Sequence, residues 1–173
     1  MPNSNRSLAG GSEEWASSLI FSAMTIRSSH EIADTWKYPH PFDFYDATAD
    51  PDDYHEFVTP TLWPEVFQQI HCHGDLVGFF CAHPILEGTA FELSLGLHPS
   101  LTGNGWGHGF VNSCLTWLDD HEYRGRMVLS VASFNMRAIK AYQAVGFVKI
   151  RDYAQMTNGG TYDFVEMELV RNT

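Results

Sequence analysis

The chain has 173 residues, of which 44% are hydrophobic and 18% are charged. This composition suits one compact domain with a hydrophobic core and excludes an intrinsically disordered protein. The net charge of −11 argues against a nucleic-acid partner, because nucleic acids are bound by basic surfaces.

Hydrophobic runs, cysteines and histidines bear on where the protein is located and on whether it binds a membrane or a metal. No apolar run approaches the length of a membrane span, and the N-terminus lacks a signal-peptide pattern, so we predict no membrane partner. Cys72, Cys81 and Cys114 have no disulfide-framework spacing, which favours a reducing compartment and a cytoplasmic location. His71 and His73 would share one face of a strand, but two ligands do not make a closed zinc site, so we predict no metal.

The N-terminal segment is rich in small polar residues. Residues 1–16 are therefore predicted to form a flexible tail, followed by a single domain at 17–173. The apolar run at 19–26 predicts a first strand. Ser28 lies three residues before Glu31 in the capping-box pattern, which predicts the start of a helix.

Aromatic residues and prolines dominate the next segment, 38–46, which predicts a loop. Its aromatic side chains either cover the core or form the wall of a substrate pocket. Pro51 directly after Asp50 predicts a short helix with an Asp cap. Two further strands are predicted at 65–71 and 75–82, joined by a tight turn.

A glycine-rich turn at 101–109 separates an alternating strand pattern at 91–97 from a helical pattern at 110–120. Glycine lets the backbone turn sharply, and the first N–H groups of the helix are unpaired at the positive end of its dipole. A strand, a glycine turn and a helix in this order predict an anion site. Phe110 occupies the place of the third glycine of a dinucleotide fingerprint, and no Gly-Lys-Ser/Thr follows, which excludes both competing motifs.

The C-terminal third alternates strands with one helix. The helix is predicted at 135–145, with Asn135 as its N-cap and Gly146 after its end. Three strands complete the chain, at 127–131, 147–150 and 162–169.

Two segments resemble one family. Residues 97–107, LHPSLTGNGWG, resemble the acyl-CoA-binding motif of the GNAT N-acetyltransferases, in which a strand ends in a His-Pro turn and Q/R-x-x-G-x-G/A opens a helix. Residues 135–147 resemble the second motif of that family, Asn-x-x-Ala-x-x-x-Tyr-x-x-x-Gly-Phe. The predicted order of elements from about residue 20 onward is also similar.

The resemblance implies an α/β (α+β) fold with a mixed, mostly antiparallel sheet flanked by helices. It implies an enzyme that transfers an acetyl group from acetyl-CoA to a primary amine of a small molecule or peptide by direct attack. It also implies that a homodimer is plausible. The alternative is a coenzyme A-binding sensor or interaction module that keeps the fold without turnover.

The family's motifs also imply roles for individual residues. The coenzyme pyrophosphate would be bound at the glycine turn, by Thr102, Gly103, Asn104, Gly105, Trp106 and Gly107. Thr102 stands where the family usually has Gln or Arg, and Asn104 stands where a basic residue is common, so binding would depend mainly on backbone N–H groups. Arg137 and Lys140 are available for compensating phosphate contacts. The pantetheine arm would be bound by Asn135 and by the main chain of Leu95, Gly96 and Leu97.

The same resemblance implies that Tyr142 is the general acid that protonates the departing thiolate. Without the motif, Tyr142 would be interpreted as a core aromatic residue of an amphipathic helix. For the general base we consider Glu92, which shares a strand face with Ser94 and Gly96, and Asp46 in the aromatic loop. Each of these carboxylates could instead be an ordinary solvated side chain.

Overall fold

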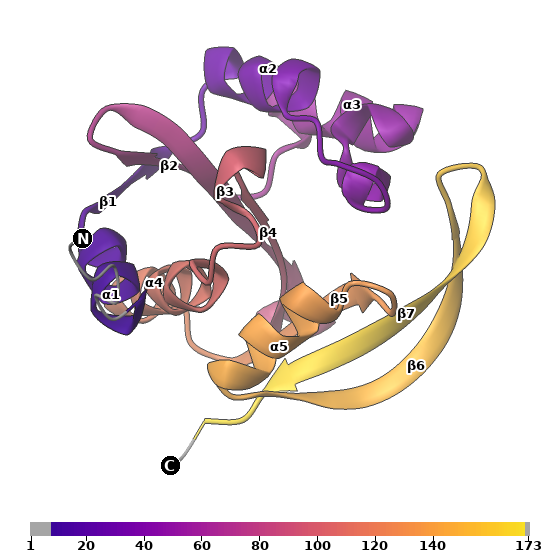
Figure 1. Ribbon diagram of the computed structural model, residues 1–173. Helices are drawn as coiled ribbons and strands as arrows, with labels where there is room; N and C mark the ends of the chain where they lie inside the picture. The colour runs from indigo at the N-terminus through magenta and orange to yellow at the C-terminus, as the bar shows by residue number, and fades with distance from the viewer. Residues whose placement is uncertain (1–7, 172–173) are drawn as a thin grey trace, which may run out of the picture.

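The computed structural model describes residues 8–171, which are organised around one seven-stranded sheet (Figure 1). Its order is β1-β2-β3-β4-β5-β7-β6, with every neighbouring pair antiparallel except β4 and β5. The strands are β1 (Leu19–Ala23), β2 (Val66–Cys72), β3 (Asp75–Ile85), β4 (Ala90–Leu97), β5 (Arg126–Ala132), β6 (Phe147–Thr157) and β7 (Gly160–Leu169). The helices are α1 (Leu8–Ser17), α2 (Ile26–Thr35), α3 (Pro51–Val58), α4 (Gly107–Asp120) and α5 (Met136–Ala144). This arrangement confirms the predicted fold class.

Helices cover both faces of the sheet: α2 and α3 lie on one face, and α4 and α5 lie on the other (Figure 1). The larger core lies under α4 and α5, where Phe110, Cys114 and Leu118 pack against Phe80 and Met127. A smaller core lies under α2 and is made by Met24, Ile32, Trp36, Phe67, Leu76 and Cys81. The alternating pattern of the strands therefore separates two packed layers, as expected for a sheet that is covered on both sides.

Two tight hairpins join neighbouring antiparallel strands, and the first confirms the tight turn predicted between 65–71 and 75–82. His73 and Gly74 connect β2 to β3, with φ values of 50° and 90°. Asn158 and Gly159 connect β6 to β7, with φ values of 50° and 74°. Two-residue hairpins need positive φ at both positions, which Asn and Gly adopt most readily.

The N-terminal segment differs from its prediction. Helix α1 spans Leu8–Ser17 and so includes residues 8–16 of the predicted tail, while residues 1–7 lie outside the described part of the chain. The helix packs on the start of α4: the rings of Trp15 and Trp106 meet edge to face at 4.6 Å. A side chain at Gly109 would come within 3.0 Å of the Ser12 hydroxyl oxygen. The partners of α1 are about 90 residues away in sequence, so its composition alone did not indicate a helix.

Helix α2 begins earlier than predicted. Thr25 is its N-cap, and the Thr25 hydroxyl oxygen accepts a hydrogen bond from the Ser28 N–H at 3.1 Å. Ser28, predicted as the cap, is instead a buried residue in the first turn. The later helix starts are as predicted: Asp50 caps α3, with Pro51 in its first turn, and Asn135 caps α5.

The sheet opens between β4 and β5. These strands pair only at Ala90–Arg126, Phe91–Met127 and Glu92–Val128. Beyond Glu92, β4 continues to Leu97 on β3 alone, while β5 continues to Ala132 on β7. A gap therefore opens between two parallel strands, and we call it the β4–β5 gap.

Within residues 8–171, no helix is both long and apolar enough to cross a membrane. Nor do these residues include a cluster of three or more His, Cys, Asp or Glu side chains that could hold a metal ion. The three cysteines are free and buried.

Candidate active site

The main chain of β4 presents unpaired groups to the β4–β5 gap. The His98 N–H donates to the Val77 carbonyl oxygen at 2.8 Å, so His98 faces β3. Because direction alternates along a strand, Gly96 also faces β3, whereas Leu95 and Leu97 face the gap. The structure therefore favours Leu95 and Leu97 over Gly96 among the predicted main-chain contacts.

The opposite edge of the gap is formed by β5. The Arg126 N–H donates to the Thr89 carbonyl oxygen at 3.3 Å, so Arg126 faces β4. The same alternation turns the main-chain groups of Ser130 and Ala132 toward the gap. Among the described residues, the main-chain groups of Leu95 on one edge and Ser130 on the other have no protein partner, whereas both main-chain groups of Ala132 are hydrogen-bonded. An extended, amide-bearing ligand can bridge such an opening in a sheet.

The glycine turn leads from the end of β4 into α4. Gly103 and Gly105 adopt φ values of 74° and 78°, which few residues other than glycine tolerate. In the described structure, none of the N–H groups from Gly103 to Gly107 donates to another protein group. Helix α4 begins at Gly107 with no side-chain cap. The turn therefore offers a row of free donors at a helix N-terminus, which suits a phosphate.

The polar side chains of this turn are committed to the turn itself. The Thr102 hydroxyl donates to the Pro99 carbonyl oxygen at 2.8 Å, and the Asn104 amide donates to the Ser100 carbonyl oxygen at 3.3 Å. Both bonds hold the loop in shape. The expected help of these two side chains in binding phosphate is thus less direct than that of the backbone.

Arg137 lies beside the glycine turn. A side chain at Gly103 would come within 2.9 Å of its Nη1 atom. The guanidinium also stacks over the Phe42 ring, 3.8 Å from the ring centre. Arg137 therefore connects α5, the glycine turn and the aromatic loop. Lys140, one turn further along α5, is exposed.

Gly96 is required by packing. A Cβ atom at this position would lie 2.1 Å from the Phe79 ring, which is its cross-strand neighbour. A glycine inside a strand is typical of a bulge or of a close approach to the backbone, and here an aromatic side chain of the protein makes that approach.

Tyr142 lies half-buried on α5 and packs edge to face on Phe147, with 5.8 Å between ring centres. Its hydroxyl makes no hydrogen bond to another described residue. Burial raises the pKa of Tyr142, and the nearby Tyr45 and Cys114 raise it further. The phenol is therefore protonated at neutral pH, the state that a general acid needs.

Asn135 has a capping role and a second contact. Its side-chain oxygen accepts from the Ala138 N–H at 3.2 Å, which caps α5. Its side chain also lies near the Tyr45 hydroxyl, where it lowers the pKa of that phenol. The residue thus lies at the junction of α5, β5 and the aromatic loop.

The two carboxylates considered for the general base, those of Glu92 and Asp46, lie on different elements and have different contacts. Glu92 is exposed at the last residue pair of β4 and β5, opposite His83 on β3. Its side chain shares a face with Ser94 and so lies on the α2 and α3 side of the sheet. Asp46 accepts from the Tyr38 N–H at 2.9 Å and so stabilises the aromatic loop.

The chain resembles known proteins over most of its length. Residues 26–147 match the sequence model of the Acetyltransferase (GNAT) family. The chain belongs to this family. Its members are acetyltransferases, which confirms the predicted class of enzyme. No curated protein sequence matches the chain.

Solved structures of GNAT proteins share its fold. The aminoglycoside acetyltransferase AAC(6')-Ib, in complex with paromomycin and acetyl-CoA, has a TM-score of 0.69 at 18% identity, covering 89% of this chain and 94% of that one. A spermidine N-acetyltransferase chimera from Vibrio cholerae has a TM-score of 0.67 at 18% identity, covering 88% and 95%. The ribosomal-protein-S5-alanine acetyltransferase from Vibrio fischeri has a TM-score of 0.66 at 16% identity, covering 88% and 93%. At these identities the likeness concerns the fold.

Two residues at the gap of this GNAT domain were not singled out from the sequence. The Tyr38 hydroxyl donates to the Leu97 carbonyl oxygen at 2.8 Å. The Tyr45 hydroxyl accepts from the Ala132 N–H at 3.0 Å. Both tyrosines belong to the aromatic loop, which the sequence left open as a core cover or a pocket wall. Its contact with both edges of the gap favours the second interpretation.

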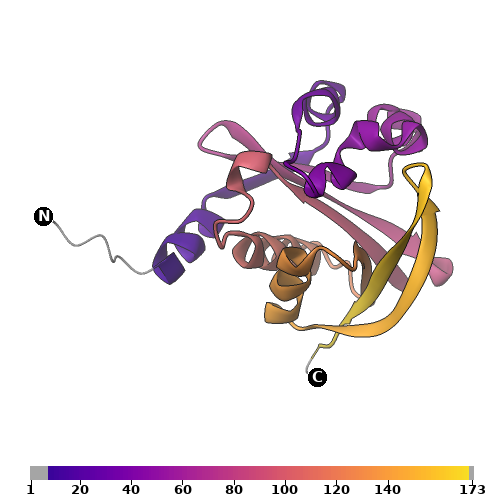
Figure 2. The same ribbon diagram turned by 45° about the vertical axis from the view of Figure 1, so that its right-hand side comes forward.

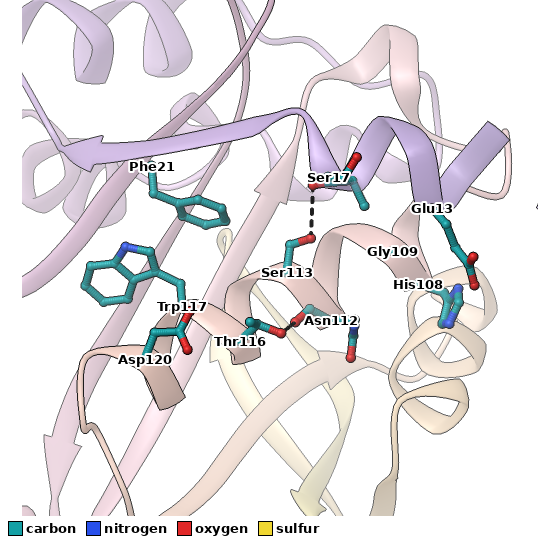
Figure 3. Close-up of a pocket in the computed structure, with 11 residues that line it drawn as sticks. Glu13, Ser17, Phe21, His108, Gly109, Asn112, Ser113, Thr116, Trp117 and Asp120 are labelled. Atoms are coloured by element: carbon teal, nitrogen blue, oxygen red, sulfur yellow. Dashed lines mark hydrogen bonds between the residues drawn. The ribbon is translucent and has the colours of Figure 1, made fainter. Parts of the chain in front are cut away.

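A pocket of about 470 Å³ lies elsewhere, between α1 and α4 (Figure 3). Phe21 and Trp117 form its apolar end, and Glu13 and His108 lie at the other. It includes none of the predicted site residues, so it is separate from the β4–β5 gap.

Proposed function

We propose that the protein transfers an acetyl group from acetyl-CoA to a primary amine of a small molecule or peptide. The observation that carries this proposal is that the β4–β5 gap continues directly into the glycine turn. Unpaired main-chain groups of β4 lead directly to a row of free N–H groups at the start of α4. A ligand with amides in its arm and phosphates at its end fits this sequence of donors and acceptors.

Different residues of the site would bind the phosphates, orient the pantetheine arm and protonate the leaving group. The N–H groups from Gly103 to Gly107 and the Arg137 guanidinium hold the phosphates. Leu95, Leu97 and Asn135 orient the pantetheine arm. Acetyl-CoA supplies an activated acyl group that an amine can attack directly. Tyr142 protonates the departing thiolate, a contribution of about 10²–10⁴-fold for a well-placed acid.

Proton removal from the incoming amine is proposed for Glu92. Its carboxylate is exposed on the α2 and α3 side of the sheet, at the point where β4 and β5 separate. An amine that enters from this side can pass a proton to Glu92 directly or through water. The proposed acceptor class is supported by the names of proteins that share the fold, which refer to spermidine and to a ribosomal protein.

We also propose a cytoplasmic location and a homodimer. The free, buried Cys72, Cys81 and Cys114 suit a reducing compartment. The dimer rests on the family resemblance alone and is tested by the molecular mass in solution.

A thiol-release assay tests the function. The full chain is mixed with acetyl-CoA and a panel of amines: spermidine, aminoglycosides, amino acids and short peptides with a free N-terminus. We expect free coenzyme A to appear with at least one amine, and acetyl-CoA to raise the unfolding temperature. Thermal stabilisation without thiol release for any amine would instead support the sensor. Absence of both effects would contradict coenzyme binding itself.

A further inference from the structure

Tyr45 extends from the aromatic loop into the β4–β5 gap. Its oxygen accepts a hydrogen bond from the Ala132 N–H, and that N–H points from β5 toward β4. The oxygen therefore lies between the two strands. It faces the edge on which Leu95 presents its free main-chain groups.

The aromatic loop holds Tyr45 firmly in this place. Phe44, its neighbour, packs edge to face on Tyr45, Phe134 and Tyr162, with ring centres 4.9–5.5 Å apart. The Asn158 amide at the tip of the β6–β7 hairpin donates to the Phe44 carbonyl oxygen at 2.8 Å. The hydroxyl is thus preorganised, which a catalytic donor requires.

The hydrogen bonds of Tyr45 leave its own proton available. The oxygen accepts from the Ala132 N–H and interacts with the Asn135 side chain. Both interactions lower the pKa of the phenol, while burial around the hydroxyl raises it by more. The phenol therefore remains protonated at neutral pH and can donate one hydrogen bond into the gap. Its other contacts polarise it toward a stronger donor.

We propose that Tyr45 is a further catalytic residue, whose hydroxyl donates a hydrogen bond to the oxygen of the transferred acyl group. This inference rests on the proposed function. As the amine nitrogen bonds to the acyl carbon, the carbon–oxygen double bond opens and negative charge collects on oxygen, opposite Tyr45. When the double bond re-forms, the carbon–sulfur bond breaks and the sulfur takes the proton of Tyr142. The amine loses its extra proton to Glu92 or water, and Tyr45 keeps its own proton throughout.

The proposal assigns the hydroxyls of Tyr45 and Tyr142 to different atoms of the thioester. Tyr45 would act on the acyl oxygen and Tyr142 on the sulfur. Each could therefore be removed separately, and the two losses would multiply because the groups stabilise different charges.

Binding provides a test that needs no turnover. We would compare Tyr45→Phe with the wild type for acetyl-CoA and for free coenzyme A, which has no acyl oxygen. We expect the variant to bind acetyl-CoA about 3–10-fold more weakly, the value of one neutral hydrogen bond, and to bind coenzyme A unchanged. In the infrared, the bound acyl carbonyl stretch should lie at higher frequency in the variant. The proposal would be overturned if Tyr45→Phe changed the affinity for acetyl-CoA and for coenzyme A equally, or changed neither, and the carbonyl stretch did not shift.

Turnover provides the second test, with the amine identified by the thiol-release panel. Tyr45→Phe should lower kcat by about 10²–10³-fold, as the loss of one oxyanion donor does. Tyr162→Phe is the matched control, because Tyr162 packs on the same Phe44 ring, and its kcat should not change. Tyr142→Phe should lower kcat independently, so the double variant should show the product of both losses. A double variant no slower than either single one would contradict separate roles. An inactive wild type would contradict the proposed function and with it a catalytic role of Tyr45, while the binding comparison would still decide whether its hydroxyl contacts the acyl oxygen.

Discussion

Gly96 lies directly under the ring of Phe79, in the strand that borders the β4–β5 gap. Movement of the ring is restricted, because it packs on Trp36, Phe57 and Phe67, with ring centres 5.0–6.4 Å away. This crowding explains why a glycine, which otherwise weakens a strand, occupies a position beside the predicted coenzyme site.

We predict that Gly96→Ala lowers the free energy of unfolding by about 1–3 kcal/mol, the usual cost of an added group in a packed core. Chemical denaturation measures this change. The matched control repeats the substitution in a Phe79→Leu background, where the ring is absent. The cost of the added methyl group should be smaller there. An equal cost in both backgrounds would mean that Phe79 is not the cause.

At the level of elements, we propose that the glycine turn and α5 form one coenzyme-binding unit. The turn contributes free N–H groups but uses Thr102 and Asn104 to hold itself, so positive charge must come from elsewhere. Arg137 supplies it from the first turn of α5 and lies within contact distance of Gly103. In this proposal, a basic residue in the second motif would compensate for the missing Gln or Arg of the first.

Arg137→Ala is predicted to weaken acetyl-CoA binding about tenfold, since hydrogen bonds to charged groups contribute about 1.5–3 kcal/mol. Lys140→Ala should weaken it less, because Arg137 rather than Lys140 is next to the turn. Both variants should also show a shallower dependence of the dissociation constant on salt. Titration calorimetry at several ionic strengths measures this.

Lys149→Ala is the control for net charge. Lys149 pairs with Asp152 on β6, away from the turn, and its loss should leave the affinity unchanged. A uniform weakening by all three substitutions would indicate a general charge effect. An unchanged affinity of Arg137→Ala would contradict its assignment to the phosphates.

Elements specified by local chemistry could be predicted from the sequence. Asp50 before Pro51, Asn135 before α5 and the glycine-containing hairpins each fix their own geometry within a few residues. Helix α1 could not be predicted, because Trp15 and Ser12 meet their partners on α4 only in the folded chain. For the same reason the sequence indicated Tyr142, which lies in a motif, but not Tyr45, whose partner Ala132 is 87 positions away.

At the scale of the whole molecule, the hydrogen bonds of Asn158 with Asp50 and Phe44, which we call the polar clasp, join the β6–β7 hairpin to α3 and the aromatic loop. The β6–β7 hairpin curls away from the sheet and brings its tip beside the aromatic loop and α3 (Figure 2). There the Asp50 carboxylate accepts from the Asn158 N–H at 3.0 Å and from the Asp52 N–H at 2.9 Å. One carboxylate thus joins the start of α3 to the far end of the sheet, and the adjacent Asn158 amide holds Phe44.

The charge state of Asp50 should therefore control how firmly this clasp holds. Hydrogen bonds from the Asn158 and Asp52 N–H groups lower the pKa of Asp50, against a smaller opposing effect of burial. A carboxyl group whose pKa is lowered by folding stabilises the protein fully above its unfolded pKa, which is about 3.9 for Asp. That stabilisation is lost as the pH falls through the lower pKa of the folded state.

We predict that Asp50→Asn lowers the unfolding temperature at pH 7, and that its difference from the wild type shrinks as the pH falls below about 4. With the asparagine oxygen at the helix cap, its NH2 group would face the Asn158 N–H. Two donors would then meet, so the contact with the hairpin should be lost. Thermal unfolding between pH 3 and 7 measures this difference in unfolding temperature. Asp52→Asn, two residues further along in the first turn of α3, is the control, and its difference from the wild type should not shrink in this way. Because the clasp positions Phe44 and hence Tyr45, Asp50→Asn should also lower kcat more than Asp52→Asn does. A difference in unfolding temperature that stays constant from pH 7 to pH 3 would show that the carboxylate charge does not hold the hairpin to the loop.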